Sequence, residues 1–169
     1  MKNHLLHAVH EFAPVYFPDS CVLILGSFPS VKSRAQKFYY GHPQNRFWKV
    51  IASVCHDGLP DGIEEKKLFL KRNRIALWDV LEECDITGSS DSSIRNPVPT
   101  ELMRILTASP IVQIYTNGRT AGNFYEKYQQ PVTGRPAIVL PSTSPANAAW
   151  SLERLISVWN QISEVTNNE

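Results

Sequence analysis

Two neighbouring segments of the chain combine residue types that could bind a flat, polar ring. The first is a small-residue turn at 26–30, Gly-Ser-Phe-Pro-Ser, which follows a short apolar run. The second is the loop at 39–48, with the sequence Tyr-Tyr-Gly-His-Pro-Gln-Asn-Arg-Phe-Trp. Glycine lets the backbone approach a ligand closely, and loop aromatics provide stacking surfaces. A fold alone does not need this density of Gly, Pro, His, Asn and aromatic residues, so we expect a binding pocket here.

The aromatic residues of this loop have two expected roles. Tyr39 and Tyr40 precede Gly-His-Pro and are expected in a loop, where they either enter the core or stack on a base. Phe47 and Trp48 begin an apolar stripe with helical spacing, so they are expected in the core. The two tyrosines are therefore the candidates for a stacking surface.

Four short apolar runs have the character of strands covered on both faces of a sheet. They are continuous rather than alternating in polarity, and they lie at 22–25, 75–78, 111–115 and 137–140. Helical patterns separate them. This alternation predicts an α/β fold, a three-layer α/β/α sandwich with a short, largely parallel four-stranded central sheet. The length of 169 residues predicts a single domain, residues 1–169.

The helical patterns have recognisable starts. One begins at Phe47, another follows Thr100 as a candidate N-cap, and a third covers 121–128. The last and clearest apolar stripe ends near Ile162, and we expect its helix to open at Ser144 and Pro145, because proline suits the first helical position.

Small and polar residues follow every predicted strand. They occupy 26–30 after the first strand, Asp79 and then 88–93 after the second, 116–118 after the third and 141–145 after the fourth. Ligands of open parallel sheets bind at the carboxyl ends of the strands. Ordinary turn chemistry explains any one of these segments. Four of them beside the aromatic loop favour a site.

Other classes of function are less well supported. His4, His7 and His10 lie three residues apart, which fits either a metal site or, as we expect, one face of an N-terminal helix. Cys21, Cys55 and Cys84 are scattered and odd in number, so we interpret them as reduced thiols of a cytoplasmic protein. We expect neither a metal nor a cofactor. No apolar run is long enough to span a membrane, and the N-terminus lacks the apolar region of a signal peptide.

Positive charge is local rather than global, since the net charge is +1. One basic group surrounds the aromatic loop, and contact with phosphates and simple solvation explain it equally well. It consists of Lys32, Arg34, Lys37, Arg46 and Lys49. A second basic group, within 66–74, is expected to be the solvated face of a helix with Glu64 and Glu65.

Several sequence motifs along the chain resemble those of the uracil-DNA glycosylase superfamily. The segment 42–48, His-Pro-Gln-Asn-Arg-Phe-Trp, is similar to the mismatch-specific branch. The segments 26–29, 77–81 with 91–99, and 140–148 look most like the hypoxanthine-DNA (deoxyinosine) glycosylase branch. The resemblance covers nearly the whole chain and implies a DNA glycosylase of α/β fold.

The chain departs from the superfamily at two positions. Most relatives have Asp or Asn where this chain has Phe28, and His or Asn where it has Ser142. A phenyl ring cannot polarise a water, so these departures argue against ordinary uracil excision. The superfamily branch with an iron–sulfur cluster needs four cysteine ligands, and three scattered cysteines exclude it.

The resemblance implies roles for individual residues. Asn45 would orient the attacking water, and His42 or a backbone amide would stabilise the departing base. The residues expected to bind the base are Gly26, Ser27, Phe28, Tyr40 and Ser142. The residues expected to contact DNA are Lys32, Arg34, Ser144, Pro145, Ala146 and Asn147.

The expected activity is hydrolysis of the N-glycosidic bond of a flipped, deaminated base, most simply hypoxanthine in double-stranded DNA. No lysine is placed to form a Schiff base, so strand cleavage is not expected. We expect a monomer in the cytoplasm, associated with the nucleoid and not with a membrane. The alternatives are excision of uracil or of a mismatched or alkylated base, a nucleic-acid-binding module without catalysis, and a small-molecule site on a generic α/β domain.

Overall fold

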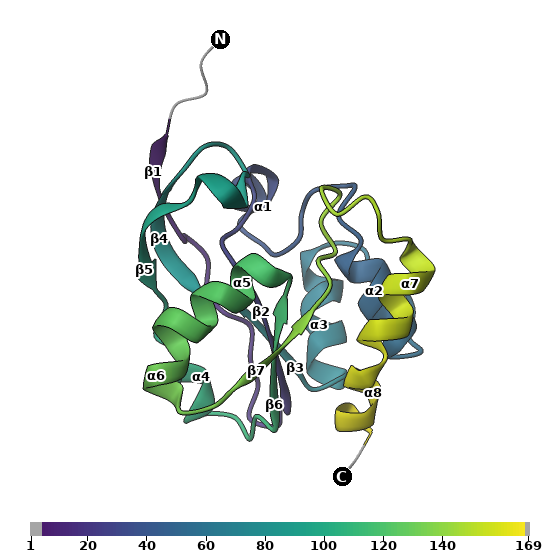
Figure 1. Ribbon diagram of the computed structural model, residues 1–169. Helices are drawn as coiled ribbons and strands as arrows, with labels where there is room; N and C mark the ends of the chain where they lie inside the picture. Colours follow the sequence, from purple (N-terminus) through teal and green to yellow (C-terminus); the bar gives the residue numbers. More distant parts are fainter. Residues whose placement is uncertain (1–4, 168–169) are drawn as a thin grey trace.

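The centre of the molecule is a sheet of four parallel strands. The structure is a computed structural model that describes residues 5–167. The strand order is β3-β2-β6-β7, formed by β3 (Ile75–Asp79), β2 (Val22–Gly26), β6 (Gln113–Asn117) and β7 (Ala137–Leu140) (Figure 1). Every residue of β2 and β3 is buried, as expected for parallel strands covered on both faces. The four predicted strands are confirmed, and only their ends differ by one or two residues.

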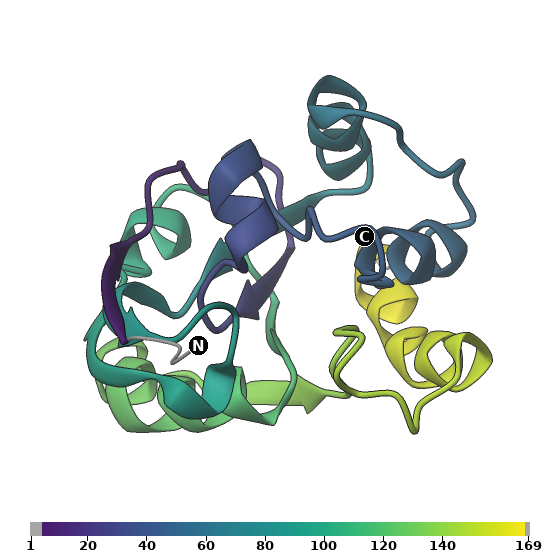
Figure 2. The same cartoon turned by 90° about the horizontal axis from the view of Figure 1, so that it is seen from above.

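Helices cover both faces of this sheet. On one face, α5 (Arg119–Phe124) continues through a π-helical turn (Tyr125–Gln129) into α6 (Gln130–Thr133). Figures 1 and 2 show α3 (Ile63–Arg72), α7 (Leu152–Trp159) and α8 (Gln161–Thr166) on the other face, together with α2 (Phe47–Val54). The predicted fold class, an α/β sandwich with a parallel four-stranded sheet, is confirmed.

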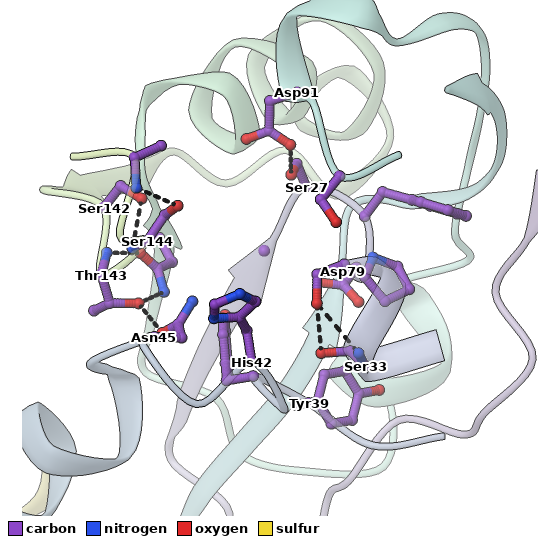
Figure 3. A pocket seen from close by; sticks show the side chains of 18 of the residues that line it. Ser27, Ser33, Tyr39, His42, Asn45, Asp79, Asp91, Ser142, Thr143 and Ser144 are labelled. Carbon is purple, nitrogen blue, oxygen red and sulfur yellow. Dashed lines mark hydrogen bonds between the residues drawn. The ribbon is translucent and has the colours of Figure 1, made fainter. Parts of the chain in front are cut away.

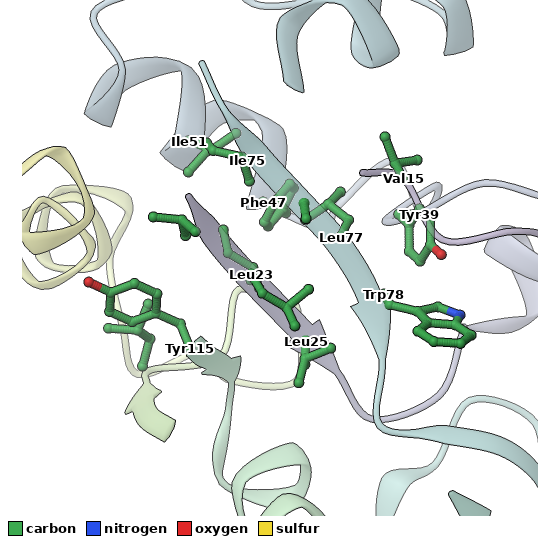
Figure 4. Packing of buried hydrophobic residues seen from close by; sticks show 14 of the residues in the cluster. Val15, Leu23, Leu25, Tyr39, Phe47, Ile51, Ile75, Leu77, Trp78 and Tyr115 are labelled. Atoms are coloured by element: carbon green, nitrogen blue, oxygen red, sulfur yellow. The ribbon is translucent and has the colours of Figure 1, made fainter. Parts of the chain in front are cut away.

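The loop aromatics Phe47 and Trp48 lie in the core, as predicted. Phe47 is fully buried, and with Ile51 it faces the sheet residues Leu23 and Ile75 (Figure 4). The indole ring of Trp159 in α7 meets the Phe47 ring edge-on, with 5.9 Å between ring centroids. These contacts fix the start of α2 against the sheet and thereby position the polar loop that precedes it.

Two predicted helix starts are wrong. The last helix opens at Leu152 with Ser151 as its N-cap, not at Ser144 and Pro145, because the intervening segment forms turns. Thr100 is not an N-cap either. Its buried hydroxyl donates to the main-chain oxygen of Asp79 at 2.7 Å, and the short helix α4 (Met103–Leu106) begins three residues later.

A second, antiparallel sheet lies beside the first and was not expected. Its order is β1-β4-β5, formed by β1 (Leu6–Val9), β4 (Leu81–Ile86) and β5 (Arg95–Pro99). The outer strands β1 and β5 are short and mostly exposed, so they lack the continuous buried apolar signal of the central sheet. The connection between β4 and β5 carries a 3₁₀ turn (Asp91–Ser93) that contacts β4. The same connection contacts the short helix α1 (Val31–Gln36), because the main-chain nitrogen of Val31 donates to the hydroxyl of Ser89 at 2.9 Å.

His7 and His10 belong to this sheet and its continuation, so the expected N-terminal helix is wrong. His7 lies on β1, where its ring nitrogens contact Glu83 at 3.1 Å and Asp85 at 3.0 Å. These two carboxylates raise the pKa of His7. His10 follows the strand and is buried, and His4 lies outside the described residues. Across residues 5–167, no helix has the length and apolar character of a membrane span.

Candidate functional site

A cleft of about 330 Å³ opens at the carboxyl ends of the parallel strands. Each strand of the central sheet contributes polar lining residues to it (Figure 3). They are Ser27 after β2, Asp79 at the end of β3, Asn117 at the end of β6, and Ser142, Thr143 and Ser144 after β7. Gly26, the last residue of β2, also lines the cleft. The loop before α2 closes one side with Tyr40, His42 and Asn45. The structure therefore brings together the strand ends and the aromatic loop that the sequence singled out.

Tyr40 forms an aromatic wall of the cleft. Its ring stacks on Phe47, with 4.0 Å between centroids and an interplanar angle of 18°. Its backbone has φ +54°, a left-handed conformation that non-glycine residues seldom adopt. Burial and the nearby charge of Asp79 raise the pKa of its phenol. Tyr39 is instead a core residue, whose hydroxyl donates to the carbonyl of Ala13 at 2.9 Å.

The Asn45 side chain is held by two hydrogen bonds to the same oxygen. Its Oδ1 accepts from the main-chain nitrogen of Phe47 and from the hydroxyl of Thr143, both at 2.9 Å. Thr143 in turn accepts from Nδ2 of Asn117 at 2.9 Å. Since both donors engage Oδ1, the group that Asn45 offers to the cleft is its NH₂. Asn45 therefore acts at the cleft as a hydrogen-bond donor and not as an acceptor.

His42 lies beside Asn45 and also presents a donor. Its Nδ1 accepts from the main-chain nitrogen of Gln44 at 3.1 Å, so a neutral His42 ring carries its proton on Nε2. The two candidate catalytic side chains thus lie on one side of the cleft and offer N–H groups (Figure 3).

Asp91 is a site residue that the sequence did not single out. It lies in the 3₁₀ turn, lines the cleft, and accepts from the hydroxyl of Ser27 at 2.8 Å. Burial raises the pKa of Asp91, the hydrogen bond from Ser27 lowers it, and the charge of Asp79 raises it again, so that the net shift is upward. A carboxylate with a raised pKa is a better proton acceptor than an ordinary aspartate. The serine-rich segment 88–93 indicates this wall in the sequence, but its pattern does not distinguish the aspartate within it as a proton acceptor.

Asp79 is the second acidic residue of the cleft that was not assigned a role. It is the last residue of β3 and is only 4% exposed. Nε2 of the buried His10 donates to Asp79 Oδ2 at 2.7 Å. Its position at the end of an apolar strand indicates in the sequence that Asp79 lies at the cleft. Its hydrogen bond with His10 could not be predicted in this way, because His10 lies 69 residues away in the sequence.

The remaining predicted site residues occupy different places. Phe28 and Ser142 line the cleft, and the hydroxyl of Ser142 accepts from the main-chain nitrogen of Ser144 at 3.1 Å. Arg34 lies over the Phe28 ring and donates to the carbonyl of Gly88 at 2.6 Å, so its guanidinium is engaged within the protein. Lys32 is exposed on α1 and is not among the cleft-lining residues.

The segment between β7 and α7 forms the rim of the cleft. Ser144, Pro145 and Ala146 line its opening, and Asn147 donates from Nδ2 to the carbonyl of Ser142 at 3.0 Å. The Arg46 guanidinium holds this segment by donating to the carbonyls of Ser144 and Asn147, each at 3.1 Å, and of Trp150. The rim and the start of α2 are therefore tied together.

The described residues contain no group of three His, Cys, Asp or Glu arranged to hold a metal ion. Cys21 and Cys84 are buried and Cys55 is partly buried. Burial raises the pKa of Cys84 to about 11 and that of Cys55 to about 12, which keeps both as thiols near neutral pH.

The chain belongs to the uracil DNA glycosylase superfamily, whose family model matches residues 13–163. It is similar to a hypoxanthine DNA glycosylase of Methanosarcina acetivorans, with 38% identity over 85% of this chain and 90% of the relative. A hypoxanthine DNA glycosylase of Methanosarcina barkeri is 33% identical over 88% of this chain and 93% of the relative. The predicted membership of this superfamily is confirmed.

A solved structure shares the fold. It is the solution NMR structure of a Methanosarcina acetivorans protein described as a candidate uracil DNA glycosylase. It superposes with a TM-score of 0.78 at 36% identity, and the match covers 93% of this chain and 97% of the other.

Proposed function

We propose that this protein is a DNA glycosylase that hydrolyses the N-glycosidic bond of hypoxanthine after the nucleotide has been flipped out of duplex DNA. The observation that carries the proposal is the base-sized cleft lined by both the Tyr40 ring and the oriented Asn45 amide. The superfamily membership supports the reaction class. The two Methanosarcina relatives named hypoxanthine DNA glycosylases support the choice of base.

Binding requires that the target nucleotide leave the base stack, because a duplex hides the glycosidic bond. The Tyr40 ring, backed by Phe47, offers a stacking face that compensates for lost stacking in the duplex. The rim at 144–147 is placed at the mouth of the cleft, where it can occupy the gap left by the flipped nucleotide. Lys32 is exposed and available for a phosphate, whereas Arg34 contributes by fixing the cleft wall.

Departure of the base needs stabilisation of the negative charge that develops on it. The NH₂ group of Asn45 and Nε2–H of His42 are the donors we assign to this task, since fixed donors aimed at a developing anion lower the barrier. This changes the role first expected for Asn45. With Oδ1 already accepting two hydrogen bonds, the side chain cannot accept a proton from the attacking water.

We assign the acceptor role to Asp91, on a different wall of the cleft. As the bond between C1′ and the base breaks, its electron pair leaves with the base. A water oxygen then bonds to C1′, and one water proton passes to the Asp91 carboxylate. No lysine is among the described residues that line the cleft, so the proposed reaction ends at the abasic site without strand cleavage.

The wider setting is also part of this proposal. We propose that the protein acts as a monomer on double-stranded DNA, in the cytoplasm and at the nucleoid.

The test is incubation of the protein with a duplex containing one deoxyinosine, followed by alkali to cleave abasic sites. Matched duplexes with uracil, xanthine or adenine at the same position measure selectivity. Release of hypoxanthine in excess over the other bases is expected. Preferential release of uracil would replace the proposed substrate, and no release of any base by the folded protein would overturn the proposed reaction.

A further inference from the structure

We propose that Asp79, held by His10, selects the base by accepting a hydrogen bond from its ring N–H. Hypoxanthine carries this hydrogen at N1, whereas the N1 of adenine is an acceptor. The inference rests on the proposed function and names the group that would determine its specificity.

The geometry leaves one oxygen of Asp79 available to a ligand. Oδ2 accepts from His10, and Oδ1 has no hydrogen-bond partner within residues 5–167. Oδ1 lies over Gly26, where a Cβ atom would come within 2.4 Å of it. The glycine therefore provides the space in which this oxygen faces the cleft floor. The hydroxyl of Tyr40 lies over the same position, 3.3 Å from where that Cβ would be, so the acceptor adjoins the stacking wall.

The backbone that carries Asp79 is fixed by hydrogen bonds. The main-chain nitrogen of Val80 donates to the carbonyl of Gly26 at 2.8 Å, and Thr100 donates to the carbonyl of Asp79 at 2.7 Å. Gln129 donates to the carbonyls of Val80 and Thr100, both at 2.9 Å. An acceptor fixed in this way discriminates well, because it cannot move to relieve a mismatched partner.

His10 acts on Asp79 and not on the ligand. Its side chain is 1% exposed and is surrounded by the rings of Phe12, Tyr39 and Phe28, with centroids 4.4, 6.0 and 6.3 Å away. Its Nδ1 has no hydrogen-bond partner within the described part of the chain. Phe28, itself buried, thus has a role of its own in the site, because its ring shields the pair from water.

This arrangement explains rejection of adenine in physical terms. A base with an acceptor at N1 would face an acceptor oxygen in a buried site, and the oxygen would lose water without gaining a partner. The hydrogen bond from His10 also draws negative charge toward Oδ2, which limits the charge that Oδ1 presents to the departing base.

Asp79→Asn provides the test, measured on duplexes with deoxyinosine or unsubstituted purine deoxyriboside, whose N1 is an acceptor. Because His10 donates to one position, the amide oxygen takes the place of Oδ2 and the NH₂ group faces the cleft. We expect kcat/KM on deoxyinosine to fall about 10–100-fold while that on purine is unchanged or higher. Asp85 is a partly exposed carboxylate on β4 outside the cleft lining, so Asp85→Asn is the matched control and should leave both values unchanged.

A second pair of variants leaves Asp79 in place. His10→Leu removes the donor and should lower the deoxyinosine-to-purine ratio, whereas His10→Gln retains an N–H and should restore it in part. Thermal unfolding checks that each variant is folded. If Asp79→Asn lowers kcat/KM equally on both substrates, or leaves the deoxyinosine-to-purine ratio of kcat/KM unchanged, the inference is overturned. Wild-type activity on deoxyinosine would still support the proposed function in that case. A wild-type protein that releases no hypoxanthine overturns both.

Discussion

The hydroxyl of Thr143 donates a hydrogen bond of 2.9 Å to Oδ1 of Asn45, and this contact fixes which end of the Asn45 amide faces the cleft. Thr143 follows β7, whereas Asn45 precedes α2, so the contact joins segments 98 residues apart in the sequence. The main-chain nitrogen of Phe47 adds a second donor to the same oxygen. Together they prevent the amide from flipping, which a single bond would not do.

Replacing Thr143 by Val should therefore lower kcat without raising KM. Valine has nearly the same shape, but it leaves Asn117 without its acceptor and Asn45 with one donor instead of two. We expect kcat on a deoxyinosine duplex to fall roughly 10-fold, corresponding to about 1–2 kcal/mol. Thr143→Ser keeps the hydroxyl and should recover most of the activity. If Thr143→Val retains full kcat, the orientation of Asn45 does not depend on this contact.

Asn45→Asp tests the donor role directly. The carboxylate can still accept from Phe47 and Thr143, so the fold is retained, but the cleft loses an N–H donor and gains an anion beside the departing base. Loss of one such donor costs about 100–1000-fold in kcat. Single-turnover release of hypoxanthine measures the effect.

Asn45→Ala is the companion variant because it removes the donor without adding charge. It should abolish base release and leave DNA binding nearly intact, as measured by fluorescence anisotropy on the same duplex. Full activity of either variant would remove Asn45 from the mechanism.

The pH dependence of the reaction should report on Asp91. Its carboxylate must be charged to accept a proton, so activity is lost as pH falls through its pKa. Because burial raises this pKa, the acid limb of the rate profile should lie above the ordinary aspartate value of about 3.9. The limb should vanish in Asp91→Asn, together with most of the rate. If the acid limb of the rate profile is unchanged in Asp91→Asn, a different group is responsible for it.

The contribution of Asp91 to stability changes with pH in the opposite direction to its contribution to activity. A pKa raised by folding means that the native state favours the protonated form. Its contribution is therefore present at low pH and is lost as pH rises through the folded-state pKa. Asp85→Asn is the control for activity, since that carboxylate lies outside the cleft lining and hydrogen bonds with Asn96 and His7 lower its pKa.

Tyr40→Ala should weaken retention of the flipped base. Loss of a stacked aromatic surface is worth about 1–3 kcal/mol, which we expect as a higher Kd for duplexes carrying a non-hydrolysable deoxyinosine analogue. Tyr40→Phe keeps the ring on Phe47 and should preserve binding. Equal binding by the alanine variant and the wild type would show that the base does not stack there.

Much of the architecture could be predicted from the sequence because its signals are local. The buried strands are continuous apolar runs, and their carboxyl ends are marked by residues such as Gly26 and Asn117. Since parallel strands present their carboxyl ends at one edge of the sheet, the position of the cleft could be predicted from the sequence alone. The core position of Phe47 followed from helical spacing in the same way.

The missed features depend on partners that are distant in sequence. His10 donates to Asp79, which lies 69 residues further along the chain, and no spacing rule relates the two. The three-stranded sheet was missed because β1 and β5 are short and exposed. The predicted start of the last helix was too early because serine followed by proline is a typical helix start. In the structure, Arg46 instead donates to the carbonyls of Ser144 and Asn147 and holds this segment in turns.

The Arg46 guanidinium contacts the rim only through main-chain oxygens. Substitutions in the rim and changes in its length therefore have different consequences. Side chains at Pro145, Ala146, Ala148 and Ala149 can be exchanged without loss of an Arg46 contact. The number of residues in the segment cannot change so freely, since one insertion displaces the later carbonyls by about 3.5 Å. Related proteins can thus vary the surface that meets DNA by substitution alone, while the length of the rim preserves the geometry of the cleft.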